Sequence, residues 1–426
     1  MKGISLNLLL FIAVTLLIDI YAFSGLRALS KKWSFLGKKW FTIAYCSYAI
    51  LLLVLLLLVV YLKVDMRIRL GVILSFFGSL LFEFCFTLFL LTDDVRRLIV
   101  FASRKFKKSA PEQRDKQPAH DAIPRSQFLL KAGLLAGAVP LAALKLNMKS
   151  GLYDYHIVRQ DLYLPNLPKA FDGLRIGQIS DIHSGSFFHH KAVKGGVEML
   201  MREKSDLIFF TGDLVNDMSD DMIDYIDLFS KVKAPLGVFS ILGNHDYGDY
   251  TDWQTPAVKK KNFDEITGTH KTLGWDLLRN ENRRLKIGNE EIGILGIENW
   301  GDLGRFPKYG RMDLAVKNTD DLPVKLLLSH DPSHWRAQVL PQYPQIDMVF
   351  AGHTHGMQCG IRTKDFQWSP VEYLYREWAG LYREGKQQIY VNVGYGFYGM
   401  HGRIGILPEI TIFTLKSAAG PSLTNT

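Results

Sequence analysis

The chain has 426 residues, of which 48% are hydrophobic, and this length accommodates two or three domains. Its mean hydropathy of +0.04 excludes a generally disordered protein. Residues 1–150 carry 21 Lys and Arg against 8 Asp and Glu, whereas residues 151–426 carry 30 against 34. Enzymes that act on nucleic acids usually carry basic charge on the domain that binds the substrate. Residues 151–426 are slightly acidic, so we expect no nucleic-acid partner. The three cysteines (Cys46, Cys85 and Cys359) offer neither a disulfide framework nor a cysteine zinc cluster.

Three long apolar runs in the first third predict membrane-spanning helices. They are Ile4–Phe23, Phe41–Leu62 and Leu70–Leu91, and about 20 helical residues cross a ~30 Å hydrocarbon core. A signal peptide is the alternative for the first run, but basic residues follow it rather than a small-residue cleavage site. We therefore predict a transmembrane region over residues 1–102, with spans at about 4–23, 41–62 and 70–91.

A fourth apolar run, Phe128–Leu144, is weaker because it contains Lys131 and Pro140. We predict that residues 103–126 are a basic linker and that residues 127–150 hold a fourth span; an interfacial helix is the alternative. Loop 24–40 carries five basic residues and loop 92–127 carries nine, and such loops stay in the cytoplasm. Four spans then predict an integral protein of the inner or plasma membrane, with everything after about residue 150 outside the cytoplasm.

Two acidic residues, Asp19 and Glu83, lie inside the predicted spans. An ionisable group at that depth is a functional candidate by default. No other polar residues form a pathway with them, so we favour a role in holding the helices together.

Residues 151–416 are typical of a strand-rich α/β domain, followed by a tail at 417–426. Short runs of aliphatic and aromatic residues predict strands at 174–179, 207–210, 238–242, 291–297, 326–328, 348–351, 388–393 and 409–415. Helical stretches at Lys191–Lys204 and Asp220–Lys231 separate the early ones. This order predicts a layered α/β sandwich of two sheets with flanking helices.

Five of the predicted strands end directly on Asp, Asn or His. Because ligand sites in α/β sheets lie at the carboxyl ends of strands, we expect these residues to meet. A turn or helix cap explains one such residue but poorly explains five. The seven candidate metal ligands are Asp181, His183, Asp213, Asn244, His330, His353 and His355.

This mixed set of oxygen and nitrogen ligands suits Mn, Fe or Zn. Seven ligands exceed what one zinc ion takes, and they fit two divalent ions that activate a shared water and neutralise a phosphoryl group. The i, i+2 spacing of Asp181 and His183, and of His353 and His355, places each pair on one face of an extended segment.

The motifs resemble the signature of the calcineurin-like metallophosphoesterases, which reads D-x-H, G-D, G-N-H-D/E, H and G-H-x-H. They stand here in that order as Asp181-Ile182-His183, Gly212-Asp213, Gly243-Asn244-His245-Asp246, His330 and Gly352-His353-Thr354-His355. The resemblance covers about residues 155–415. Pro165–Gly173 and Gly356-Met357-Gln358 make it most similar to the membrane-associated or exported bacterial branch.

The resemblance implies a fold of two mixed β-sheets with flanking helices and a hydrolase that cleaves a phosphodiester or phosphomonoester with metal-activated hydroxide. It implies one metal held by Asp181, His183, Asp213 and His355, and a second held by Asp213, Asn244, His330 and His353, with Asp213 as the bridge. It also implies that His245 faces the phosphate and assists the leaving group, while Asp246 orients that imidazole.

A lipid or envelope substrate is favoured by the membrane tether, by the predicted outward orientation and by an aromatic segment. The segment contains Phe366, Trp368, Tyr373, Tyr375, Trp378 and Tyr382, and Trp and Tyr favour the membrane interface. Packing in the core or in a lid explains these aromatics equally well. The alternatives are a membrane sensor or scaffold with a ligand-binding phosphoesterase fold, and a protein phosphatase. We expect Arg403 either to contact phosphate or to lie on the surface.

Overall fold

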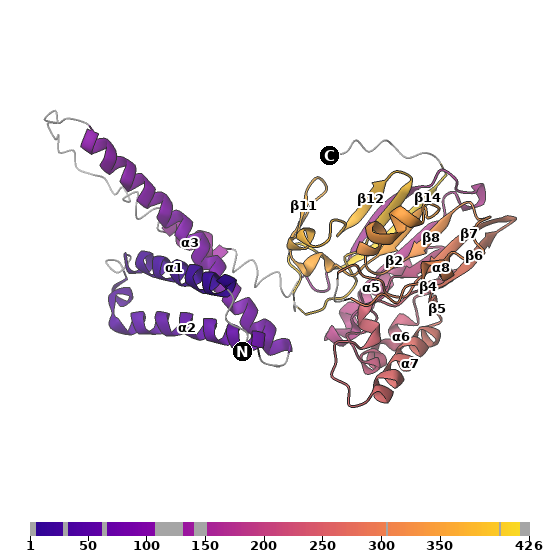
Figure 1. Ribbon diagram of the computed structural model, residues 1–426, viewed down its shortest axis with the longest axis horizontal. Helices are drawn as coiled ribbons and strands as arrows, with labels where there is room; N and C mark the ends of the chain where they lie inside the picture. The colour runs from indigo at the N-terminus through magenta and orange to yellow at the C-terminus, as the bar shows by residue number, and fades with distance from the viewer. Residues whose placement is uncertain are drawn as a thin grey trace. The chain divides into compact units, whose positions relative to one another are not determined.

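The computed structural model describes residues 6–28, 33–61, 66–106, 131–139, 151–303, 306–399 and 402–417. The chain divides into two compact units, Met1–Leu146 and Asn147–Thr426. Figure 1 shows long helices in the first unit and a helix-covered pair of sheets in the second.

The first unit is helical. It contains α1 (Leu6–Ala28), the short 3-10 helix η2 (Ser34–Gly37), α2 (Lys39–Tyr61) and α3 (Met66–Phe106). Among the described residues, three helices are long and apolar enough to cross a membrane, at Leu10–Ala28, Lys39–Val59 and Ser75–Ser103. These helices confirm the prediction of an apolar helical region ahead of the α/β domain.

Helix α3 is longer than predicted, because it continues past Leu91 to Phe106 and so into the predicted linker. Asp93 sustains the extra turns: its carboxylate accepts hydrogen bonds from Arg96 and Arg97, one turn further on, at 2.8 Å each. At 1.5 Å per residue, 41 residues extend about 60 Å, twice the thickness of a bilayer core. Residues 131–139 of the predicted fourth span are helical, and its remainder and residues 107–126 lie outside the described residues.

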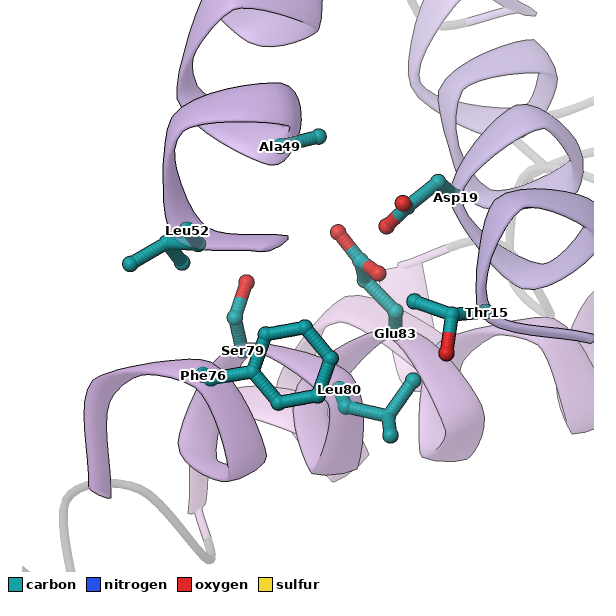
Figure 2. A pocket seen from close by; sticks show the side chains of 8 residues that line it. All are labelled: Thr15, Asp19, Ala49, Leu52, Phe76, Ser79, Leu80 and Glu83. Carbon is teal, nitrogen blue, oxygen red and sulfur yellow. The ribbon is translucent and has the colours of Figure 1, made fainter. Parts of the chain in front are cut away.

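Asp19 and Glu83 meet inside this helical unit. The hydroxyl of Tyr45 donates to Glu83 Oε1 (2.8 Å) and also lies 3.2 Å from the backbone carbonyl of Asp19, so it joins α1, α2 and α3. Figure 2 shows the two carboxyl groups pointing toward one another at a cavity of about 10 Å³. Its lining comprises Thr15, Asp19, Ala49, Leu52, Phe76, Ser79, Leu80 and Glu83. These contacts favour the predicted packing role.

Within its described residues, the second unit contains two six-stranded sheets of mixed direction, as predicted. The first sheet has the order β1-β14-β2-β3-β4-β5 and the second has the order β12-β13-β9-β8-β7-β6. The strands of the first sheet are β1 (His156–Tyr163), β2 (Arg175–Ile179), β3 (Leu207–Phe210), β4 (Val238–Ser240), β5 (Asp276–Leu277) and β14 (Glu409–Lys416). Those of the second are β6 (Glu281–Ile287), β7 (Glu290–Gly296), β8 (Lys325–Leu328), β9 (Met348–Ala351), β12 (Gly380–Glu384) and β13 (Gln387–Val391).

The helices of this unit lie over the sheets, and a small hairpin is added to them (Figure 1). The α-helices are α5 (His190–Arg202), α6 (Ile226–Phe229), α7 (Pro256–Leu273), α8 (Met312–Ala315) and α9 (Leu340–Gln342), with a π-helix at Trp335–Val339. Short 3-10 helices lie at Lys169–Phe171, Ser184–Ser186, Ser219–Tyr225, Asn244–Tyr247, His355–Gln358 and Pro370–Tyr373. Strands β10 (Ile361–Arg362) and β11 (Gln367–Trp368) form the hairpin.

Successive side chains along a strand point to opposite faces of the sheet, so a strand such as β3 contributes to the core on both of its faces. In β3, Leu207 and Phe209 pack into the core between the two sheets, whereas Ile208 and Phe210 pack under the helices on the outer face. All four side chains are buried, and this explains why the sequence of the strand is a continuous apolar run. Burial on both faces fixes the register of the strand, and therefore fixes where the residues after Phe210 emerge.

Two helical features differ from prediction. The sequence analysis missed α7, although Thr255 caps its first turn by accepting from the Val258 N–H and Gly274 ends it at φ +79°. The predicted helix Asp220–Lys231 is mostly the 3-10 helix Ser219–Tyr225, followed by the single-turn α6.

One glycine permits the close packing of a C-terminal loop against the extension of β2. The Gly396 N–H donates to the Asp181 carbonyl at 2.8 Å, and a Cβ on Gly396 would lie 1.8 Å from the Ile182 carbonyl oxygen. We expect Gly396→Ala to destabilise the unit by about 1–3 kcal/mol, the usual effect of overpacking. The midpoint of thermal unfolding of the full-length protein measures it.

Gly268→Ala is the matched control, because Gly268 lies inside α7 with open space where its Cβ would be. It should stabilise the protein by about 0.5–1 kcal/mol. Equal unfolding midpoints for the two variants would contradict the packing described for Gly396.

Candidate metal centre

The carboxyl ends of five strands bring all seven predicted ligands together. Strands β2, β3 and β4 are parallel neighbours in one sheet, and β8 and β9 are parallel neighbours in the other. Each ends two to four residues before a candidate ligand, and the two sheets face each other across one core. Their imidazoles and carboxylates fall into overlapping groups whose ligand atoms lie within 4.8 Å of one another.

Asp213 occupies the middle of the cluster. Its Oδ2 lies 3.1 Å from Nε2 of His330 and 3.5 Å from Nε2 of His183. The Nδ1–H of His330 donates to the Thr211 carbonyl at 2.7 Å, and this contact orients the ring so that Nε2 faces Asp213. Asp213 therefore stands between two groups of nitrogen and oxygen donors.

One group lies on the side of Asp181, where Nε2 of His355 is 3.3 Å from the Asp181 carboxylate. The other lies around His353, whose Nδ1 is 2.7 Å from Asn244 Oδ1 and 3.3 Å from His330 Nε2. Asp181 is fully buried, and the His330 ring is likewise inaccessible to solvent.

The backbone at the ligands is strained. Asp181, His183, Asp213, His353 and His355 all have φ between +47° and +73°. Such conformations disfavour residues with a Cβ by about 1 kcal/mol or more each, and they concentrate at functional sites. The predicted reason for the i, i+2 pairing is therefore wrong: these segments are left-handed turns, not extended strands.

The donor set fits divalent metal ions. Among the described side chains, Nδ1 of His183 and Nε2 of His355 are buried without a hydrogen-bond partner, which is uncommon unless a ligand satisfies them. Burial alone would raise the pKa of Asp181, but the neighbouring His355 and His330 outweigh it and hold that pKa below its ordinary value. The pKa of Asp213 is likewise held far down, despite burial, by His330 and His245. Both carboxylates are thus ionised and available as ligands.

His245 and Asp246 have a different relation from the predicted one. The Nδ1–H of His245 donates to the backbone carbonyl of Asn216 at 2.6 Å, so that carbonyl orients the imidazole. Asp246 accepts hydrogen bonds instead from the N–H groups of Asp213 and Leu214, at 2.9 and 2.8 Å. The prediction that Asp246 orients His245 is therefore wrong; Asp246 holds the loop that carries Asp213. Burial lowers the pKa of His245 to about 3, so its ring is neutral.

Tyr375 is a contact of the centre that the sequence analysis did not assign. Its hydroxyl lies 2.8 Å from His353 Nε2 and donates to Asp331 Oδ2 at 3.4 Å. With its proton on Nε2, His353 donates to the Tyr375 oxygen and presents Nδ1 to Asn244 and His330. The position of Asp331, directly after His330, was the only sequence signal for this chain of contacts.

Part of the aromatic segment is buried and part of it is exposed. Tyr375 and Trp378 are buried and pack with Val393 and Ile406, whereas Phe366, Tyr373 and Leu374 are exposed. The loop that follows β13 adds Tyr398, whose ring stacks on His183 at 5.0 Å and lies 4.3 Å from His245.

Arg403 is not a surface residue, so that prediction for it is wrong. One of its guanidinium nitrogens lies 3.2 Å from Nδ1 of His355, and contact with phosphate stays a prediction. The Arg403 side chain is fully buried, and its guanidinium donates to the backbone carbonyls of Val393, Gly394, Gly396 and Ile406. Arg403 therefore braces the loop that carries Tyr398.

Comparison with known proteins agrees with this geometry. A family model described as "Probable Calcineurin-like phosphoesterase, transmembrane domain" matches residues 4–152, and one described as "Calcineurin-like phosphoesterase" matches residues 174–357. An uncharacterized metallophosphoesterase of Bacillus subtilis, YkuE, is 31% identical over 270 residues, which are 62% of this chain and 84% of the relative.

Two further relatives have related names. A transmembrane protein with metallophosphoesterase domain from Danio rerio is 28% identical over 272 residues, covering 62% of this chain and 57% of that protein. The phosphodiesterase YaeI of Escherichia coli is 29% identical over 239 residues, covering 56% of this chain and 80% of the relative.

Fold and site together define a metal-dependent phosphoric ester hydrolase that carries a transmembrane domain. The chain belongs to the calcineurin-like metallophosphoesterases.

The hydrogen bond from His353 to Tyr375 is testable through metal binding. Tyr375→Phe removes the acceptor that fixes the His353 tautomer, so we expect metal affinity to fall about 10- to 100-fold, as for other such supporting contacts. Calorimetric titration of the full-length protein with Mn²⁺ measures it. Tyr373→Phe is the control, because Tyr373 is 77% exposed; equal affinities for the two variants would contradict this role.

Proposed function

We propose that this protein is a membrane-anchored, dinuclear-metal phosphodiesterase whose centre works outside the cytoplasm on a lipid or another envelope component. The observation that carries the dinuclear proposal is the position of Asp213, with one imidazole 3.1 Å and another 3.5 Å from the same carboxylate oxygen. A carboxylate placed between two donor groups suits a bridge between two ions.

In this proposal, Asp213 contributes to both metal sites. Asp181, His183 and His355 complete one site, and Asn244, His330 and His353 complete the other. Mn, Fe and Zn all suit this mixture of imidazole, carboxylate and amide donors. When bound, the ions neutralise the phosphoryl group and lower the pKa of a coordinated water.

The remaining roles belong to the protein. The Nδ1–H bond from His245 to Asn216 fixes the ring and leaves Nε2 as the nitrogen that contacts the leaving-group oxygen in our proposal. Asp246 keeps the bridging carboxylate in place by binding the N–H groups of its loop. We favour a diester over a monoester because the relative YaeI is named a phosphodiesterase.

Hydrolysis of two model esters tests the activity. We expect the purified full-length protein with Mn²⁺ to hydrolyse bis-p-nitrophenyl phosphate faster than p-nitrophenyl phosphate, and to bind two equivalents of metal. Asp213→Asn should abolish hydrolysis and metal binding together, while His245→Ala should keep both metals and slow turnover by about 10²–10⁴-fold. Asp224→Asn, at an exposed position, is the control.

The outcomes separate the alternatives. A metal content that stays at one equivalent after metal is added would contradict the dinuclear site. Loss of metal in His245→Ala as severe as in Asp213→Asn would contradict the assigned roles. A metal-loaded protein that hydrolyses neither ester nor a phosphopeptide would instead support the ligand-binding sensor, and selective hydrolysis of the phosphopeptide would support a protein phosphatase.

Reporter fusions test the location of the catalytic unit. With loops 24–40 and 92–127 in the cytoplasm and a fourth span within 127–150, alkaline phosphatase fused after residue 426 should be active and a fluorescent protein there should be dark. Fusions after Phe106 give the control, with the opposite pattern expected. Fluorescence after residue 426 without phosphatase activity would mean three spans and a cytoplasmic enzyme.

A further inference from the structure

Five exposed apolar or aromatic side chains lie on segments that are close in the sequence, or joined by contacts, to the metal centre. Phe188 is 65% exposed, Tyr250 44%, Met357 46%, Tyr373 77% and Leu374 58%. We name these five residues the apolar rim. A single exposed apolar residue is ordinary, but a group of them around a functional site marks an interaction surface.

Contacts tie one side of the rim to the ligands. Asn244 Nδ2 donates to the Tyr250 hydroxyl at 2.9 Å, and the Tyr250 ring lies 4.6 Å from that of His245. Tyr373 and Leu374 directly precede Tyr375, whose hydroxyl contacts His353. These three rim residues therefore lie at the edge of the site itself.

Met357 lies on the same edge through the loop that carries Tyr398. It stands two residues after the ligand His355, at φ +52°, and the next residue, Gln358, donates to the Tyr398 carbonyl at 2.6 Å. The Tyr398 ring stacks on His183. Met357 is therefore an exposed residue of the turn that carries His355 and contacts the loop of Tyr398.

Phe188 belongs to an aromatic layer at the start of the catalytic unit. Its ring lies 5.5 Å from Tyr153 and 6.0 Å from Phe397, and its N–H donates to the Tyr153 hydroxyl at 3.1 Å. Phe397 immediately precedes Tyr398. Phe397 also lies 5.8 Å from Tyr153, and the next residue, Tyr398, stacks on His183.

Tyr153 is also where the chain leaves the transmembrane domain, because that family match ends at residue 152. The covalent connection to the membrane therefore enters beside the rim. The bilayer is the apolar phase to which the chain connects this unit. Arg376, two residues after Leu374, has a 75% exposed side chain and lies 3.8 Å from the buried Glu377 carboxylate.

We propose that the apolar rim sits in the surface of the bilayer that holds this chain's own helices, and that the metal centre takes the phosphate ester of a lipid headgroup from that surface. Tyr side chains suit the headgroup level, while Phe, Leu and Met bury apolar area below it. Water then adds across one P–O bond, and a diester lipid gives an alcohol and a phosphomonoester. This inference rests on the proposed phosphodiesterase function and names its substrate class.

Photocrosslinking tests the docking without measuring activity. A photoreactive phenylalanine is placed at position 373 or 188 of the full-length protein in phospholipid nanodiscs, and lipid adducts are detected by mass spectrometry. Positions 258 and 314 are the controls, because Val258 and Leu314 are 43% and 45% exposed on α7 and α8. We expect adducts at the rim only; equal labelling at all four positions, or none at the rim, would overturn the proposal.

Hydrolysis in the same nanodiscs tests the substrate class. The ratio of lipid-ester to bis-p-nitrophenyl phosphate hydrolysis should fall about tenfold in the double variant Tyr373→Ser/Leu374→Ser and stay unchanged in Leu314→Ser. Hydrolysis of the soluble ester without lipid hydrolysis would overturn this inference and leave the proposed phosphodiesterase standing. Failure on both esters would overturn the proposed function and the lipid substrate with it.

Discussion

The buried carboxylate of Asp213 is the constraint on which the site depends. A charged group without solvent is stable only when donors or cations surround it, and here His183, His330 and a backbone N–H lie around it. Asp246 holds its loop in place from the opposite side by accepting N–H bonds from Asp213 and Leu214. The two buried acids thus have different roles: Asp213 faces the other candidate ligands, and Asp246 holds the backbone that carries Asp213.

The sheets supply the rigidity that this arrangement requires. Strands β3 and β9 are buried on both faces, so the turns after them begin at fixed points at the edge of the sandwich. The left-handed conformations of five ligand residues persist because the strands and hydrogen bonds on either side determine them. The stable sheets therefore hold the candidate ligands in backbone conformations that these residues would not adopt by local preference.

The loop that follows β13 connects the metal centre to the first residues of the catalytic unit. Arg403 binds four backbone carbonyls and so holds the loop of Tyr398 against His183 and His245. The same loop carries Phe397, which packs on Tyr153 at the entry of the chain into the unit. Phe397 and Tyr398 thus contact the start of the unit and the metal centre from neighbouring positions.

The sequence by itself determined the three long apolar helices, the two sheets and the seven candidate ligands, because hydrophobic runs and strand-end motifs are local patterns. Helix α7 was also within reach, since Thr255 and Gly274 mark its ends. Only the tertiary structure decided that Asn216 rather than Asp246 orients His245, that Tyr375 supports His353, and that Arg403 is buried. These contacts join residues from separate loops, and no spacing along the chain encodes which loops fold against one another.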